Sequence, residues 1–124
     1  MKTRKTKTPR QKAVRAADAQ MSRYIRARDG QCVICGKREG LQNGHLITRG
    51  KYATRWEEDN CYCQCAGCNL RHEFQPEIFT DWWISRHGEE AYHDLVRKSN
   101  TIRKFSTAEI EEIAAYYKQK RAEL

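Results

Sequence analysis

The sequence lacks any apolar run near the roughly 18 residues that a transmembrane helix requires, so a membrane protein is not expected. No apolar segment follows the basic N-terminus, which excludes a secretory signal peptide there. No internal repeat is visible. Without a secretion signal, the six cysteines among 124 residues are expected to bind metal rather than to form disulfides, and the expected compartment is the cytoplasm.

Acidic residues are nearly absent from the first part of the chain. The whole sequence holds 24 Lys and Arg against 16 Asp and Glu, but residues 1–28 hold ten basic residues and only one acid, Asp18. We therefore expect residues 1–12 to form a flexible basic arm that contacts phosphate groups through Lys5, Lys7 and Arg10. A solvated tail that only aids solubility is the alternative.

The rest of the chain, residues 13–124, is predicted to be a single α+β domain. Helical periodicity begins at Ala13 and Asp29-Gly30 ends it, whereas a capping box at Ser106 to Glu109 opens a last helix. Between these helices the pattern predicts two short strands, a polar loop and three further helices. The ranges are 42–48 and 60–64 for the strands, 48–59 for the loop, and helices that begin near Cys68, at Pro76 and at Ala91.

Four of the cysteines form two CxxC pairs separated by 29 residues. Each pair directs two thiolates to one centre, and two pairs complete the tetrahedron of a structural zinc ion. The ligands are Cys32, Cys35, Cys65 and Cys68. A pair of redox-active dithiols is the alternative. Cys61 and Cys63 belong to no such pair, and we expect them to be buried on one strand face as small apolar groups.

Polar side chains cluster around these pairs. His45 lies on the first strand, Asn60 precedes the second pair, and Asn69, His72 and Glu73 follow it at the start of a helix. Hydrolysis of a phosphodiester requires a base for water and a cation that stabilises phosphoryl charge. A neutral imidazole can be the base, and oxygen or imidazole ligands can hold Mg²⁺.

The order CxxC, His, Asn-x4-CxxC-Asn resembles the zinc-bearing HNH, or ββα-metal, endonucleases. Within them, SRYIRARDGQCVICG, the GH followed by TRG, EDN-x4-CxxCN and GEEAYHDLV make residues 22–100 most similar to the phage NinG-like (Rap) recombination proteins. The resemblance implies a small ββα-metal centre with a structural four-cysteine zinc site, flanked by an N-terminal helix and C-terminal helices. For a phage protein, the compartment is the cytoplasm of the bacterial host.

The resemblance also implies individual roles. His45 would be the general base, Asn60 would hold the loop and orient the histidine, and Asn69 would ligate a catalytic Mg²⁺ or Mn²⁺. His72 or Glu73 would complete that cation's ligands. The sequence departs from the family at two places. Gly44 stands where many relatives carry an acidic ligand, and Asn69 stands where the motif name has its last histidine.

The expected function is a metal-dependent DNA endonuclease that acts on branched or single-stranded recombination intermediates. Arg49, Lys51 and Arg55, in the loop after His45, are expected to contact the DNA backbone. A non-catalytic, zinc-stabilised nucleic-acid-binding module is the main alternative, and a zinc adaptor whose C-terminal helices dock a protein is a weaker one. A homodimer and such a protein partner both stay open.

Overall fold

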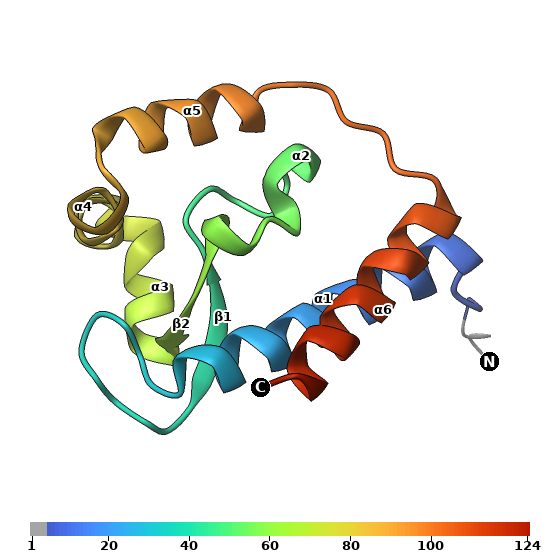
Figure 1. Cartoon of the computed structure of the whole chain (residues 1–124), viewed down its shortest axis with the longest axis horizontal. Coiled ribbons are helices and arrows are strands. Elements are labelled where there is room, and N and C mark those ends of the chain that lie inside the picture. The colour runs from blue at the N-terminus through green and yellow to red at the C-terminus, as the bar shows by residue number, and fades with distance from the viewer. Residues whose placement is uncertain (1–4) are drawn as a thin grey trace.

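The computed structural model describes residues 5–124, and within them it is α+β (Figure 1). A two-stranded sheet lies between a pair of helices from the two ends of the chain and three helices from its middle. No helix in the described range is long and apolar enough to cross a membrane. The elements are α1 (Pro9–Asp29), β1 (Leu41–His45), α2 (Tyr52–Arg55), the 3-10 turn η1 (Glu58–Asn60), β2 (Cys61–Cys65), α3 (Ala66–Phe74), α4 (Pro76–His87), α5 (Glu89–Ser99) and α6 (Thr107–Ala122).

The two strands pair antiparallel, with Leu41 opposite Cys65 and His45 opposite Cys61. Every residue of β2 is buried, because α1 and α6 cover one of its faces while α4 and α5 cover the other. β1 ends at residue 45 rather than at the expected 48. Beyond it the backbone of Ile47 bonds to the side chain of Asn60 instead of to a neighbouring strand.

Helices α1 and α6 lie side by side and run in the same direction (Figure 1). Ala13, Ala17 and Met21 of α1 are almost fully buried, and they share one apolar cluster with Ile110 and Tyr117 of α6. The two alanines allow the helices to approach closely, while the larger side chains fill the space beside them. The N-terminal helix is therefore held in place by the C-terminal one.

Helix α1 begins at Pro9, four residues before the start expected from apolar periodicity. The Thr8 hydroxyl accepts the Gln11 N–H at 3.1 Å, and the Gln11 side chain accepts the Thr8 N–H at 2.9 Å, which forms a capping box. Proline suits the first helical position because it has no N–H to leave unpaired. Residues 9–12 are thus helical rather than part of a flexible arm, and residues 1–4 lie outside the described range.

A second apolar cluster joins the hairpin to α4 and α5. Phe79 and Trp83 of α4 are almost fully buried there, together with Leu46, Tyr62 and Leu95. The predicted starts of α4 and α6 are confirmed, and the Ser106 capping box is present. The segment expected as a polar loop instead contains α2 and η1.

Candidate functional site

The four cysteines of the two CxxC pairs meet at one point, with their sulfur atoms all within 4.8 Å of one another. The Cys35 and Cys65 sulfurs lie 3.7 Å apart. Zinc–sulfur bonds of ~2.3 Å give a tetrahedron with edges of about 3.8 Å, so this donor set fits a zinc ion closely. Four protein ligands fill every position, and such an ion is structural rather than catalytic.

Backbone geometry prepares these thiols for a metal. The Gly36 N–H donates to the Cys32 carbonyl at 2.9 Å, and Gly36 has a φ of +80°, which a glycine adopts without strain. At the start of α3, the Cys65 sulfur accepts the Cys68 N–H. Burial opposes ionisation of Cys32, but hydrogen bonds from backbone N–H groups outweigh it and lower its pKa to about 7. A backbone hydrogen bond from Cys68 also lowers the pKa of Cys65, whereas burial and the neighbouring thiols raise the pKa of Cys68 to about 12, so the thiolate form that binds metal is favoured at Cys32 and Cys65.

Cys61 and Cys63 lie earlier along β2, outside this cluster. Both are fully buried in the apolar core against α1, as expected from the sequence. The Cys61 thiol lies 3.8 Å from the Met21 sulfur. Burial raises the pKa of Cys61 and raises the pKa of Cys63 to about 11, so both are neutral thiols.

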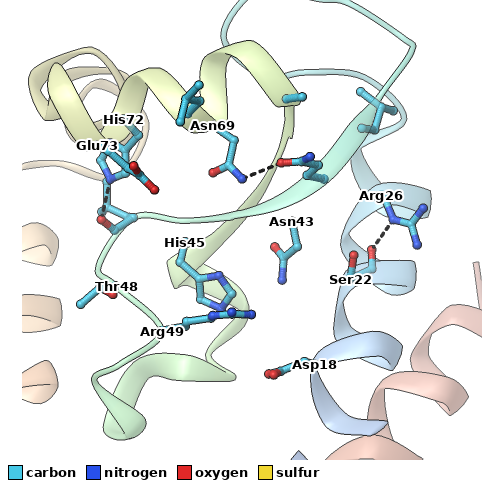
Figure 2. Close-up of a pocket in the computed structure, with 15 residues that line it drawn as sticks. Asp18, Ser22, Arg26, Asn43, His45, Thr48, Arg49, Asn69, His72 and Glu73 are labelled. Atoms are coloured by element: carbon cyan, nitrogen blue, oxygen red, sulfur yellow. Dashed lines mark hydrogen bonds between the residues drawn. The ribbon is translucent and has the colours of Figure 1, made fainter. Parts of the chain in front are cut away.

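A cleft of about 950 Å³ opens beside the metal centre, between α1 and α3 (Figure 2). β1 and the loop after it form its floor. In Figure 2, His45 lies between the side chains of Asn69, His72 and Glu73 on α3 and those of Asp18 and Arg26 on α1. The other labelled residues of its wall are Ser22, Asn43, Thr48 and Arg49.

His45 is the ionisable side chain at the end of β1. Its Nε2 lies 3.0 Å from the carbonyl oxygen of Arg55, and since a carbonyl only accepts, Nε2 carries the proton. Nδ1 has no hydrogen-bond partner among the described residues, so its lone pair is free. Burial lowers the pKa of His45, in spite of the Arg55 carbonyl and the Asp18 charge, which act in the other direction. The imidazole is therefore neutral near pH 7.

Asn60 holds the loop that carries this carbonyl. Its side chain is fully buried, accepts the Ile47 N–H at 2.9 Å and donates to the carbonyls of Ile47 at 3.0 Å and Thr54 at 3.1 Å. Asn60 makes no hydrogen bond with the His45 ring. It fixes the backbone at Ile47 and at Thr54, the residue before Arg55, so it acts on the histidine through the backbone.

The residues of α3 contribute to the cleft unequally. The Asn69 side chain donates to Gln42 at 2.9 Å, which leaves its amide oxygen free, and Glu73 is exposed at the rim. His72 donates from Nε2 to the Leu46 carbonyl at 2.8 Å, and its Nδ1 is buried without a partner. His72 thus ties α3 to the end of β1. Its role as a metal ligand stays a prediction, with only Nδ1 left for that purpose.

Arg55 was expected to contact a nucleic-acid backbone, and the structure corrects this. Its guanidinium is buried and binds both carboxylate oxygens of Asp18, at 3.0 and 2.5 Å, as well as the Arg49 carbonyl. Asp18 also accepts the Trp56 indole N–H at 2.9 Å. A charge held in this way cannot reach a phosphate. Asp18 is the site residue that sequence analysis missed, because it lies 37 positions from Arg55.

The other expected backbone-binding cations are exposed. Lys51 donates to Asn100 at 2.9 Å and Arg10 to the Phe105 carbonyl at 2.6 Å, so each is partly engaged. The side chains of Arg49, Lys5 and Lys7 make no ion pair or hydrogen bond with another residue of the described range. Arg49 lies in the wall of the cleft, whereas Lys5 and Lys7 line a groove beside the start of α1.

Packing around position 44 allows only a glycine there. A Cβ at this position would lie 2.3 Å from the Gln64 side-chain oxygen and 3.0 Å from the Tyr62 carbonyl. The side chain of Gln64 is buried, and neither its oxygen nor its nitrogen has a partner. An acidic residue at position 44 is therefore excluded unless Gln64 moves. Among the described residues, only the four cysteines gather three or more His, Cys, Asp or Glu ligand atoms.

Comparison with known proteins gives one result. No curated protein and no solved structure matches the chain. The family model described as bacteriophage lambda NinG protein matches residues 1–124, the whole length of the sequence. A match over the whole chain shows the family, and this protein belongs to the NinG family of bacteriophages.

Proposed function

We propose that this protein is an HNH-type, metal-dependent endonuclease that hydrolyses phosphodiester bonds in DNA, with branched or single-stranded recombination intermediates as its substrates. The observation that carries the proposal is the state of His45, a neutral imidazole whose Nε2 proton is held by the Arg55 carbonyl while Nδ1 is free at the cleft. Membership of a phage family fits a role in recombination of phage DNA.

The chemistry follows from this arrangement. Nδ1 of His45 accepts a proton from the water molecule whose oxygen attacks the phosphorus atom, the ester P–O bond to one sugar breaks, and the leaving oxygen takes a proton from bulk water. The Arg55 carbonyl stabilises the imidazolium that forms. The free oxygens of Asn69 and Glu73 lie across the cleft and are the donor type that Mg²⁺ and Mn²⁺ take. A cation held by these oxygens would neutralise the negative charge that develops during hydrolysis.

Two protein oxygens are few ligands for a cation, but they suit Mg²⁺, which keeps several of its water molecules when it binds to proteins. The structural zinc supports this geometry indirectly. Cys65 and Cys68 belong to the end of β2 and the first turn of α3, so a zinc ion bound to them fixes the helix that carries Asn69. The base and the cation ligands then keep a constant separation, as efficient catalysis requires.

The test is nicking of linear, single-stranded and four-way-junction DNA in Mg²⁺ or Mn²⁺ by the wild type, His45→Ala and His93→Ala. His93 is exposed on α5 and outside the cleft, so its variant is the matched control. Removal of a general base typically costs about 10²–10⁴-fold in rate. We expect a loss of that size for His45→Ala and none for His93→Ala. Equal cutting by all three proteins would reject the proposed base.

A second candidate function is a non-catalytic, zinc-stabilised module that binds nucleic acid. The observation that favours it is Gly44, where packing against Gln64 leaves no room for an acidic ligand. It predicts salt-sensitive DNA binding together with no cleavage of any DNA form in Mg²⁺ or Mn²⁺. The same nicking assay therefore separates the two functions.

A further inference from the structure

One face of α1 points away from the apolar core, and its residues line two surface grooves. Gln11 and Arg15 line the groove beside Lys5 and Lys7, whereas Asp18, Ser22 and Arg26 line the cleft at His45. These five α1 positions recur every three or four residues, which places them in one stripe along the helix.

The stripe presents positive charge along its length. Arg15 and Arg26 form no ion pair with any residue of the described range, and the Arg26 side chain bonds only to the Ser22 carbonyl of its own helix. Asp18 is the one acid in the stripe, and its charge is neutralised by Arg55. The side of the cleft formed by α1 and by Arg49 is therefore cationic, while Glu73 lies on the opposite wall.

The spacing of the two arginines suits a nucleic-acid backbone. Eleven residues separate Arg15 from Arg26, which corresponds to about 16 Å along the axis and to a rotation of only about 20° from three full turns. Phosphates on one strand of B-DNA are spaced ~3.4 Å along the duplex axis, so the two side chains span about five nucleotide steps. The His45 cleft lies along the same side of the helix.

We propose that this stripe of α1 binds the sugar–phosphate backbone of DNA and leads it from the groove at Lys5 and Lys7 to the cleft at His45. The proposal rests on the function proposed above and adds the surface that positions the substrate. Arg15 and Arg26 bind phosphates on the two sides of Asp18. Since contacts to phosphate carry no sequence information, the surface confers affinity and orientation but not sequence preference.

The experiment measures the binding of labelled duplex DNA by fluorescence anisotropy at several salt concentrations. All proteins carry His45→Ala, so that the DNA stays intact, and all retain the full chain and zinc. One variant adds Arg15→Gln and Arg26→Gln. The matched control adds Lys118→Gln and Arg121→Gln, which remove the same charge from exposed positions on α6 outside both grooves.

Each phosphate contact contributes ~0.9 to the slope of log K against log salt concentration. We expect the slope of the α1 variant to fall by about 1.8, equivalent to ~60-fold weaker binding at 0.1 M salt, while the α6 variant matches its parent. An equal loss in both variants, no loss in either, or tighter binding of polyglutamate than of DNA overturns the proposal.

The outcome is independent of the cleavage test. If the wild type cleaves no DNA in Mg²⁺ or Mn²⁺ but the two slopes differ as expected, the nuclease function fails and the DNA-binding surface stands. If the wild type cleaves DNA and the slopes are equal, the surface is rejected and the nuclease function stands.

Discussion

Replacement of Asn60 by alanine is expected to destabilise the protein severely, although the residue is small and uncharged. The Asn60 side chain makes three hydrogen bonds to backbone groups of Ile47 and Thr54 and is fully buried. A hydrogen bond contributes about 0.5–1.5 kcal/mol, and a buried group left without a partner costs about 1–3 kcal/mol. Loss of all three bonds should therefore lower the free energy of unfolding by about 3–5 kcal/mol.

Asn60→Asp gives a sharper version of the same prediction. The aspartate keeps an acceptor for the Ile47 N–H, but it places a second oxygen against the carbonyls of Ile47 and Thr54, which the asparagine amide meets as a donor. We expect this near-isosteric change to be at least as destabilising as alanine. A role in packing alone predicts the opposite order.

Urea unfolding followed by circular dichroism measures both effects. Asn100→Ala is the matched control, because Asn100 is exposed and its side chain makes one hydrogen bond, with Lys51. That variant should lose no more than about 0.5 kcal/mol. A loss below about 1 kcal/mol for Asn60→Ala, or a loss equal to that of the control, would refute the reasoning from buried hydrogen bonds.

Three further predictions concern the metal centre, the hairpin and the base. The purified chain should contain one zinc ion, and its removal by a chelator or by Cys65→Ser should abolish cooperative unfolding of the hairpin and α3, since zinc binding to such sites is worth ~10–16 kcal/mol. Gly44→Ala should cost about 1–3 kcal/mol in urea unfolding, and Gln64→Ala in the same chain should recover part of it. Because burial lowers the pKa of His45, kcat should increase with pH through a titration below pH ~6.5, the usual pKa of histidine. The folded state binds fewer protons than the unfolded state in this range, so its stability should fall as the pH drops below that value. A limb above pH 7 in the kcat profile would contradict the third prediction.

The sequence predicted those features that depend on neighbouring residues. The spacing of the cysteines located the metal ligands, and Gly30 and Ser106 marked the ends of helices because capping is local. The early start of α1 was also encoded locally, in Thr8 and Gln11, but the basic composition of that segment favoured a flexible arm. The four cysteines are accordingly the best predicted part of the site.

Features that depend on contacts between residues far apart in the sequence were not predictable. Arg55 follows a polar stretch and has the composition of a surface residue, yet it is buried because Asp18 of α1 neutralises it. A charged side chain is buried only with a partner, and the partner is unknown until the fold brings α1 to the loop. The same holds for Gly44. Only glycine fits at this position, because a side chain there would collide with Gln64 on the opposite strand.

The parallel packing of α1 against α6 has a consequence for how the cleft is assembled. During synthesis α1 is made some hundred residues before the helix that buries its apolar stripe. Until then Ala13, Ala17 and Met21 have no partner from α6, and the packing behind the cleft wall that bears Asp18 and Arg26 is incomplete. No residue of α6 lines that cleft, yet α6 packs against the apolar face of the helix that forms one of its walls, so α6 supports the cleft from the other side of α1.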